Sequence, residues 1–285
     1  MTAMKLGQIE VAQKAIDQLS AVADRSGELG SGRLAAAWAM IEAWGPTPVP
    51  DALVATASIL EQVRGDPSAE PLVLSVHAFL LALEGEIVAA RQMLSRQREL
   101  LENSGQRMLL WASWGQATGR VELSAGDPVR AEGPLRESYV ALTEVGERGF
   151  ASTVAGQLAH ALIALGRYDD AIEFVEACKV AAQGDVLSEI LWRTASARLL
   201  AHRGENDEAV ALAEAAVAIA LQTEWPNVQG DALLDQTRVL RRCGRTHAGE
   251  PAAEAFSVYR RKRNRVGTTR AERMLEELGR HASGG

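Results

Sequence analysis

The stretch Leu162-Ile163-Ala164-Leu165-Gly166-Arg167-Tyr168-Asp169-Asp170-Ala171 decides the fold, because its pattern recurs along the chain. In it, a leucine stands four residues before a glycine and an alanine stands five residues after that glycine. Glycines at this point of the pattern follow one another at intervals of 38 to 41 residues, at Gly7, Gly45, Gly85, Gly126, Gly166, Gly204 and Gly244. A fixed period of about 20–50 residues is typical of helical repeat arrays. We therefore predict one repeat domain over residues 1–285.

A second series of glycines lies halfway between the members of the first, at Gly27, Gly65, Gly105, Gly146, Gly184 and Gly267. Trp225-Pro226 takes the place of the missing member between the last two. Glycine permits a tight turn and proline ends a helix, so each repeat is predicted to be a helical hairpin. The sequence thus predicts an all-α, right-handed superhelical solenoid of about seven antiparallel hairpins, with about fourteen helices of roughly 15–18 residues.

The two ends of the array differ from its middle. Residues 267–280 are predicted to form a capping helix with Ala271, Met274, Leu275 and Leu278 on its inner face, and residues 281–285 a flexible tail. The chain opens on the pattern of a second helix at Gly7, with no first helix before it. This exposed edge predicts either a homodimer or an upstream ATPase or effector domain.

Composition favours a cytoplasmic protein. No apolar run is long enough to span a bilayer, and Met1–Leu6 lacks the features of a secretory signal. The two cysteines, Cys178 and Cys243, cannot form a disulfide framework or a metal knuckle, and both are interpreted as buried, inert thiols.

The segment Gly166–Ala171 resembles the tetratricopeptide repeat, whose second helix opens with Gly-x-Tyr-x-x-Ala, and Gly204–Ala209 is a looser match. The period here is about forty residues rather than the family's 34. The resemblance implies a non-catalytic array that binds a partner on its concave face.

From Gly126 onward the chain is similar to the C-terminal helical-repeat region of bacterial adenylate cyclase-like and signal-transduction ATPase (LuxR-type) regulators. The stretches that carry this likeness are Glu147–Ala155, Leu191–Arg193 and Gly230–Asp235. Gln236-Thr237-Arg238 and Thr246-His247-Ala248-Gly249 depart from the family's pattern, so the last repeat is degenerate. In the first half of the chain, only the spacing of the repeats resembles that of this family.

Catalytic chemistry is not expected. The chain has no phosphate-binding loop, no candidate strands for the metal-binding aspartates of a cyclase, and no histidine at metal-ligand spacing from another ligand. We predict no enzyme activity, no cofactor and no metal. The basic run Arg260–Arg265 is interpreted as a solvated helix end, with contact to an acidic partner as the alternative and nucleic acid not expected.

Partner binding is the remaining kind of site. Most of the six tryptophans fall on the first helix of a hairpin, where they act either as core fillers or as anchors for a partner. We centre a candidate groove on Trp192-Arg193. Polar residues on this and the neighbouring first helices complete it: Gln157, His160, Ser196, Asp231 and Asp235.

Two functions follow from these patterns. The first is a protein–protein interaction scaffold, the partner-binding array of a larger bacterial signalling or transcriptional regulator, which docks a protein or peptide in its concave groove. The alternative is a small-molecule sensor whose superhelix encloses a ligand and signals to an ATPase module.

Overall fold

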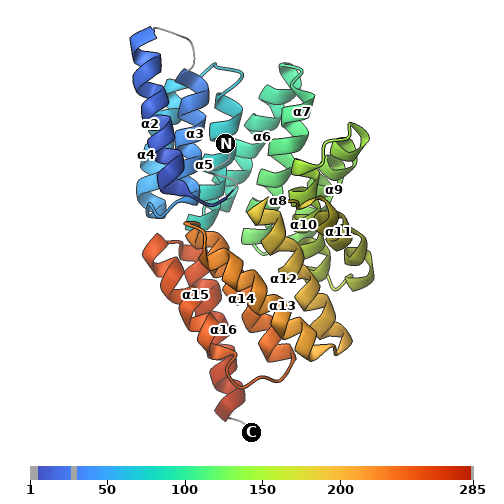
Figure 1. Cartoon of the computed structure of the whole chain (residues 1–285). Coiled ribbons are helices and arrows are strands. Elements are labelled where there is room, and N and C mark those ends of the chain that lie inside the picture. Colours follow the sequence, from blue (N-terminus) through green and yellow to red (C-terminus); the bar gives the residue numbers. More distant parts are fainter. Residues whose placement is uncertain (1–5, 27–30, 284–285) are drawn as a thin grey trace.

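The computed structural model describes residues 6–26 and 31–283, and every regular element within these ranges is a helix. Fourteen continuous helices of 14 to 19 residues follow one another there, and each packs on the next (Figure 1). One of them is made of three consecutive segments, α7 (Arg107–Leu109), a π-helical turn η1 (Leu110–Trp114) and α8 (Gly115–Ser124). The all-α class and the number of helices are as predicted.

The helices form two layers that alternate along the chain. The inner layer packs helix by helix on itself as well as on the outer layer. Its members are α3 (Ser31–Trp44), α5 (Glu70–Glu84), α7–η1–α8, α10 (Gly149–Ala164), α12 (Val186–Arg203), α14 (Pro226–Arg242) and α16 (Arg265–Ser283). The outer helices are α2 (Ile9–Ser26), α4 (Val49–Gln62), α6 (Ile87–Asn103), α9 (Pro128–Glu144), α11 (Tyr168–Ala181), α13 (Asn206–Leu221) and α15 (Gly249–Lys262).

The apolar pattern of each helix follows its layer. The inner helix α10 is buried almost without interruption from Ala151 to Ile163, because it has neighbours on every side. The outer helix α6 buries only the stripe Ala90, Leu94, Gln97 and Leu101, at the spacing of one helix face. The alanine five residues after each turn glycine is fully buried in the middle repeats, at Ala90, Ala131, Ala171 and Ala209.

Most of the glycines that mark the repeat make the turns. Gly166 has a φ of 74° and Gly85 a φ of 97°, in the left-handed region that glycine adopts without strain. Gly267 is an exception, because it lies inside α16 and the turn before that helix is made by Arg263, at a φ of 55°. Gly27 lies outside the described residues.

The helix predicted over residues 267–280 is α16, which extends from Arg265 to Ser283 and so includes part of the expected tail. Its Ala271 and Met274 are buried, and Leu275 and Leu278 are half-buried, on the predicted inner face. Within the described ranges, six inner–outer hairpins are complete, with α2 before them and α16 after them.

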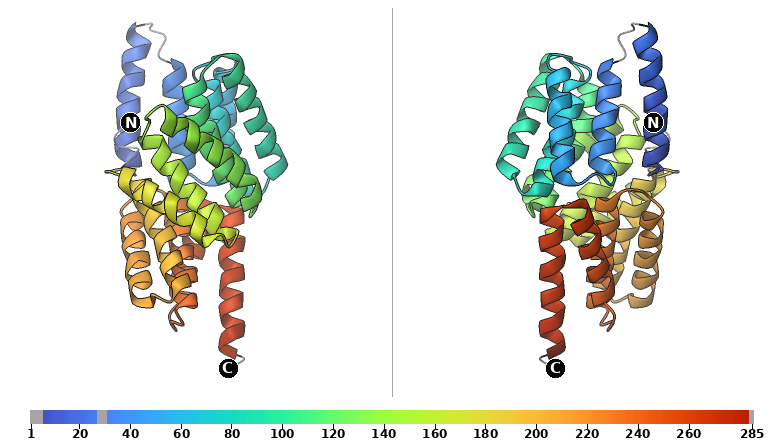
Figure 2. Two further views of the ribbon diagram at one scale, coloured as in Figure 1. Left: turned by 90° about the vertical axis from the view of Figure 1, so that its right-hand side faces the viewer. Right: turned by 90° about the vertical axis from the view of Figure 1, so that its left-hand side faces the viewer.

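The two ends of the array touch one another. Helix α16 packs on α5, and the ends of the first helices face the ends of the last ones (Figures 1 and 2). An apolar cluster joins Ile9 and Ile41 of the first helices to Trp225 at the start of α14. The backbone N–H of Glu224 donates to the carbonyl oxygen of Gly7 at 2.8 Å. The edge of α2 that the sequence suggested would be exposed is therefore partly covered by the turn between α13 and α14.

Lys262 makes the most specific of these contacts. Its side chain is 1% exposed, and its Nζ donates to the carbonyl oxygens of Glu42, at the end of α3, and of Gly45 and Thr47, in the turn after it, at 3.2, 2.6 and 2.6 Å. The basic run Arg260–Arg265 is thus not wholly a solvated helix end, because its central lysine is buried and joins the last hairpin to the first.

Candidate functional site

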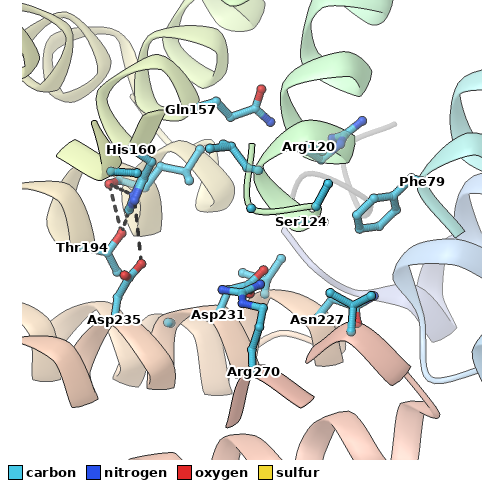
Figure 3. Close-up of a pocket in the computed structure, with 18 of the residues that line it drawn as sticks. Phe79, Arg120, Ser124, Gln157, His160, Thr194, Asn227, Asp231, Asp235 and Arg270 are labelled. Atoms are coloured by element: carbon cyan, nitrogen blue, oxygen red, sulfur yellow. Dashed lines mark hydrogen bonds and ion pairs between the residues drawn. The ribbon is translucent and has the colours of Figure 1, made fainter. Parts of the chain in front are cut away.

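A cavity of about 980 Å³ lies between the inner helices, and each of the seven contributes to its wall. We call it the central cavity. Apart from Pro128, the first residue of α9, its lining comes from inner helices and the turns at their ends. Six arginines and four carboxylates are among the lining residues. The site is therefore built by the whole array rather than by one repeat (Figure 3).

One side of the cavity holds an ionic network around Asp235 of α14. Its carboxylate lies 2.9 Å from Nη1 of Arg238 and 3.5 Å from Nη1 of Arg198. Burial by itself raises the pKa of Asp235, but the positive charges of Arg198 and Arg238 outweigh burial and lower the pKa to about 2. Asp235 is therefore ionised and neutralised by its own neighbours.

His160 of α10 faces this carboxylate in its neutral form. Its Nε2 lies 3.2 Å from the carbonyl oxygen of Leu191 and 3.0 Å from Oγ1 of Thr194, and its Nδ1 lies 3.8 Å from Asp235. A carbonyl only accepts, so Nε2 carries the proton and Nδ1 does not. Burial lowers the pKa of His160, which keeps the ring uncharged at neutral pH.

A second carboxylate, Asp231, connects the cavity to the last two helices. Its Oδ1 accepts from the Tyr259 hydroxyl at 2.6 Å and from Nη1 of Arg270 at 3.2 Å. The Tyr259 ring lies between Gly230 and Gly267, where an added Cβ would come within 2.5 Å of a ring atom at either glycine. Both carboxylates of α14 are thus paired within the protein.

The opposite side of the cavity carries polar groups without partners. The Arg120 guanidinium lies over the rings of Trp44 and Phe79, 5.0 and 5.6 Å from their centroids. Its Nε is buried, and the side chain has no hydrogen bond or ion pair with any residue that the structure describes. Burial lowers the pKa of Arg120 to about 10, well above neutrality, so the group stays charged.

Three further residues that line the cavity each have a buried atom without a hydrogen-bond partner within the described part of the chain: Nε1 of Trp225, Nδ2 of Asn227 and Oε1 of Gln157. Trp225 lies next to the arginine, because its ring packs on Trp44 at 5.3 Å between centroids. In Figure 3, Arg120, Phe79 and Asn227 lie on one side of the open space and His160, Thr194 and Asp235 on the other. Buried polar groups normally have partners, so such a concentration of unpaired ones calls for an explanation.

Four of the seven residues predicted for a partner groove line this cavity: Gln157, His160, Asp231 and Asp235. Trp192, Arg193 and Ser196 do not. The Trp192 ring packs against Arg193 at 4.2 Å and Lys179 at 5.3 Å, and its Nε1 donates to Glu189. The structure therefore does not bring the proposed aromatic anchor together with the polar residues chosen around it.

The positions missed on α12 follow a helical stripe. Leu187, Leu191, Thr194 and Arg198 face the cavity at intervals of three or four residues, with Ile190 beside Leu191. Trp192 and Ser196 fall about half a turn away from Thr194. This periodicity was present in the sequence. Arg120, Trp44 and Trp225 carried no such signal, because they come from distant repeats that only the touching of the array's ends brings together.

Other chemistry has little support in the residues described. Cys178 is buried, and burial raises its pKa to about 12, which makes the thiol unreactive. Among these residues, no group of three or more His, Cys, Asp or Glu side chains could hold a metal ion. None of the described helices is both long and apolar enough to cross a membrane.

A comparison with models of known protein families finds none that matches this chain, and a comparison with curated proteins finds no match either.

Proposed function

We propose that this chain is a non-catalytic receptor domain whose central cavity binds a small molecule, the alternative of the two functions that the sequence predicts. The observation that carries this proposal is the convergence of all seven inner helices on one cavity that contains buried, unpaired polar groups. Ligand sites of about 300–1,000 Å³ combine apolar walls with a few such groups that orient the ligand. The central cavity has this composition.

The shape of the array supports the same proposal. The contacts of α16 with α5 and of Lys262 with the α3–α4 turn bring the first and last hairpins together beside the cavity. A right-handed superhelix of about one turn accounts for this arrangement. A ligand that touches several inner helices stabilises that closed form, and this is how binding would be passed to a neighbouring module.

The protein-scaffold function remains a prediction. The groove predicted for it is centred on Trp192 and Arg193, and neither residue lines the cavity. The resemblance to bacterial signalling regulators is compatible with either function. In a regulator of that kind, we propose that an ATPase or effector module next to the receptor domain responds to the bound ligand.

A thermal-shift screen with a metabolite collection tests the proposal, since a ligand that binds only the native state raises the melting temperature. The informative variant is Ala164→Phe, because Ala164 is an exposed residue that lines the cavity and a phenyl ring there takes up part of the space that a ligand would occupy. Ala215→Phe, at an exposed position of the outer helix α13, is the matched control. We expect hits that the control retains and Ala164→Phe loses. No hits, or hits that both variants retain, would refute a ligand site in this cavity.

A further inference from the structure

The unpaired donors of the central cavity form one group, which we call the donor cluster: Arg120, Trp225 and Asn227. Trp44 holds it together, because the guanidinium of Arg120 and the ring of Trp225 both pack on the Trp44 ring. Asn227 follows Trp225 by two residues in the first turn of α14, and its Oδ1 accepts from Asn264 at 2.9 Å, which leaves its Nδ2 protons free. Nε1 of Trp225, Nδ2 of Asn227 and Nε of Arg120 are buried too deeply to touch a ligand, so the two Nη groups of Arg120 are the donors of the cluster that a ligand can reach.

The arginines that line the cavity differ in whether a carboxylate pairs with them. Arg198 and Arg238 are paired with Asp235, and Arg270 is paired with Asp231. Arg265 and Arg273 also line the cavity but are exposed to solvent. Arg120 is therefore the one lining arginine, among the residues described, whose guanidinium is partly buried without a carboxylate beside it. Keeping such a charge in the folded protein is costly unless an anion pairs with it.

We infer that the ligand is a small organic acid whose carboxylate binds Arg120 of the donor cluster. This inference rests on the proposed function and names its ligand class. The two Nη groups of a guanidinium match a planar carboxylate with two parallel hydrogen bonds. The body of the acid lies against the apolar part of the wall, which includes Leu123, Leu187, Val228 and Val266.

Other ligand classes fit the cluster less well. A cation is repelled by Arg120, and a neutral molecule leaves its charge without a partner. Inorganic phosphate carries up to two charges, and one guanidinium flanked by the rings of Trp44 and Phe79 provides a single positive charge and an apolar surround. The carboxylate is favoured because it has one charge and a planar shape.

The test compares acids with their own primary amides, which keep the size and shape and remove the charge. Isothermal titration of the full chain uses phenylacetate, 4-phenylbutyrate, indole-3-acetate and octanoate, each paired with its amide, and inorganic phosphate. We expect at least one of these acids to bind about tenfold or more tightly than its amide, the usual size of a hydrogen bond to a charged group. Arg120→Gln should remove that difference, and Arg261→Gln, at an exposed position on α15, should keep it.

Each other result has a defined meaning. Amides that bind as well as their acids overturn the carboxylate assignment but leave the ligand cavity in place. Binding of phosphate without any of the acids does the same. If no acid binds up to millimolar concentration while the metabolite screen yields neutral ligands that Ala164→Phe abolishes, the inference falls and the proposed function stands. Should Arg120→Gln fail to fold, Arg120→Lys and the acid–amide comparison on the unmodified chain still decide the question.

Discussion

Lys262 donates a hydrogen bond to the carbonyl oxygen of Gly45 at 2.6 Å, although 217 positions separate the two residues in the chain. The same ammonium group reaches two further carbonyl oxygens, at the end of α3 and in the turn after it. Three acceptors match the three protons of a charged lysine. This one side chain therefore joins the end of the array to its beginning.

Removing this contact should weaken the whole array. In Lys262→Met the three carbonyl oxygens lose a buried donor, and we expect the free energy of unfolding to fall by about 1–3 kcal/mol. Urea denaturation followed by circular dichroism measures it. Arg261→Met, at the exposed neighbour, should change stability by no more than about 0.5 kcal/mol. Equal effects of the two substitutions would show that the contact between the ends contributes nothing.

A second prediction follows from the packing of the Tyr259 ring against Gly230. A methyl group at Gly230 would lie 2.5 Å from the ring, so Gly230→Ala must displace the tyrosine and its hydrogen bond to Asp231. We expect a loss of about 1–3 kcal/mol in the free energy of unfolding. Gly249→Ala meets nothing within 4 Å at the start of α15 and should be neutral or slightly stabilising. Comparable losses in both variants would contradict this account of the tyrosine.

Acid should destabilise the protein through Asp235. Because folding lowers the pKa of this carboxyl from its ordinary 3.8 to about 2, the stabilisation is complete above pH 4 and is lost as the pH falls toward 2. The loss amounts to about 2 kcal/mol at one pKa unit per 1.36 kcal/mol. Urea denaturation between pH 5 and pH 2.5, roughly the span of the two pKa values, should show a shallower decline for Asp235→Asn. Parallel pH profiles would mean that Asp235 is not paired as described.

Replacing Arg120 should have opposite effects on the stability of the protein and on ligand binding. Its buried, unpaired charge is costly, so we expect Arg120→Met to raise the free energy of unfolding by about 1 kcal/mol in the absence of ligand. The same substitution should abolish the preference for acids over amides. Denaturation and calorimetry on one protein preparation test both effects. A clear loss of stability would mean that the stacking on Trp44 and Phe79 outweighs the cost of the charge.

A substitution of Trp192 distinguishes a ligand site in the central cavity from the groove that the sequence predicts around Trp192. It lies away from the stripe of α12 that lines the cavity, so Trp192→Ala should leave the ligand-induced rise in melting temperature unchanged. Thr194→Val, on the lining stripe of the same helix, should reduce that rise, because it removes the hydroxyl that contacts His160. A loss of the ligand response in Trp192→Ala with Thr194→Val unaffected would move the site to the groove first inferred from the sequence.

The repeat could be predicted from the sequence because each hairpin carries its own local signals. Turn glycines such as Gly85 and Gly166 occupy left-handed positions that other residues adopt only with strain, and buried alanines such as Ala171 let neighbouring helices approach closely. Part of the site was predictable for the same reason: Gln157, His160, Asp231 and Asp235 all lie on inner helices, and all four line the cavity.

The positions of the two ends of the array, and the other residues of the cavity, could not be predicted because they depend on how the repeats stack. Glycine spacing determines where a hairpin turns, but small angles between successive hairpins add up along the array and decide where its ends lie. These added angles bring Lys262 to the carbonyl oxygen of Gly45 and bring Trp225 to Trp44. Arg120 lies over the Trp44 ring and has no carboxylate beside it. The helices, their order and their pairing into hairpins could be predicted from the sequence, because they depend on contacts within and between adjacent repeats. The cavity inside the inner layer and the unpaired charge in its wall could not, because both depend on how repeats that are far apart in the chain meet in space.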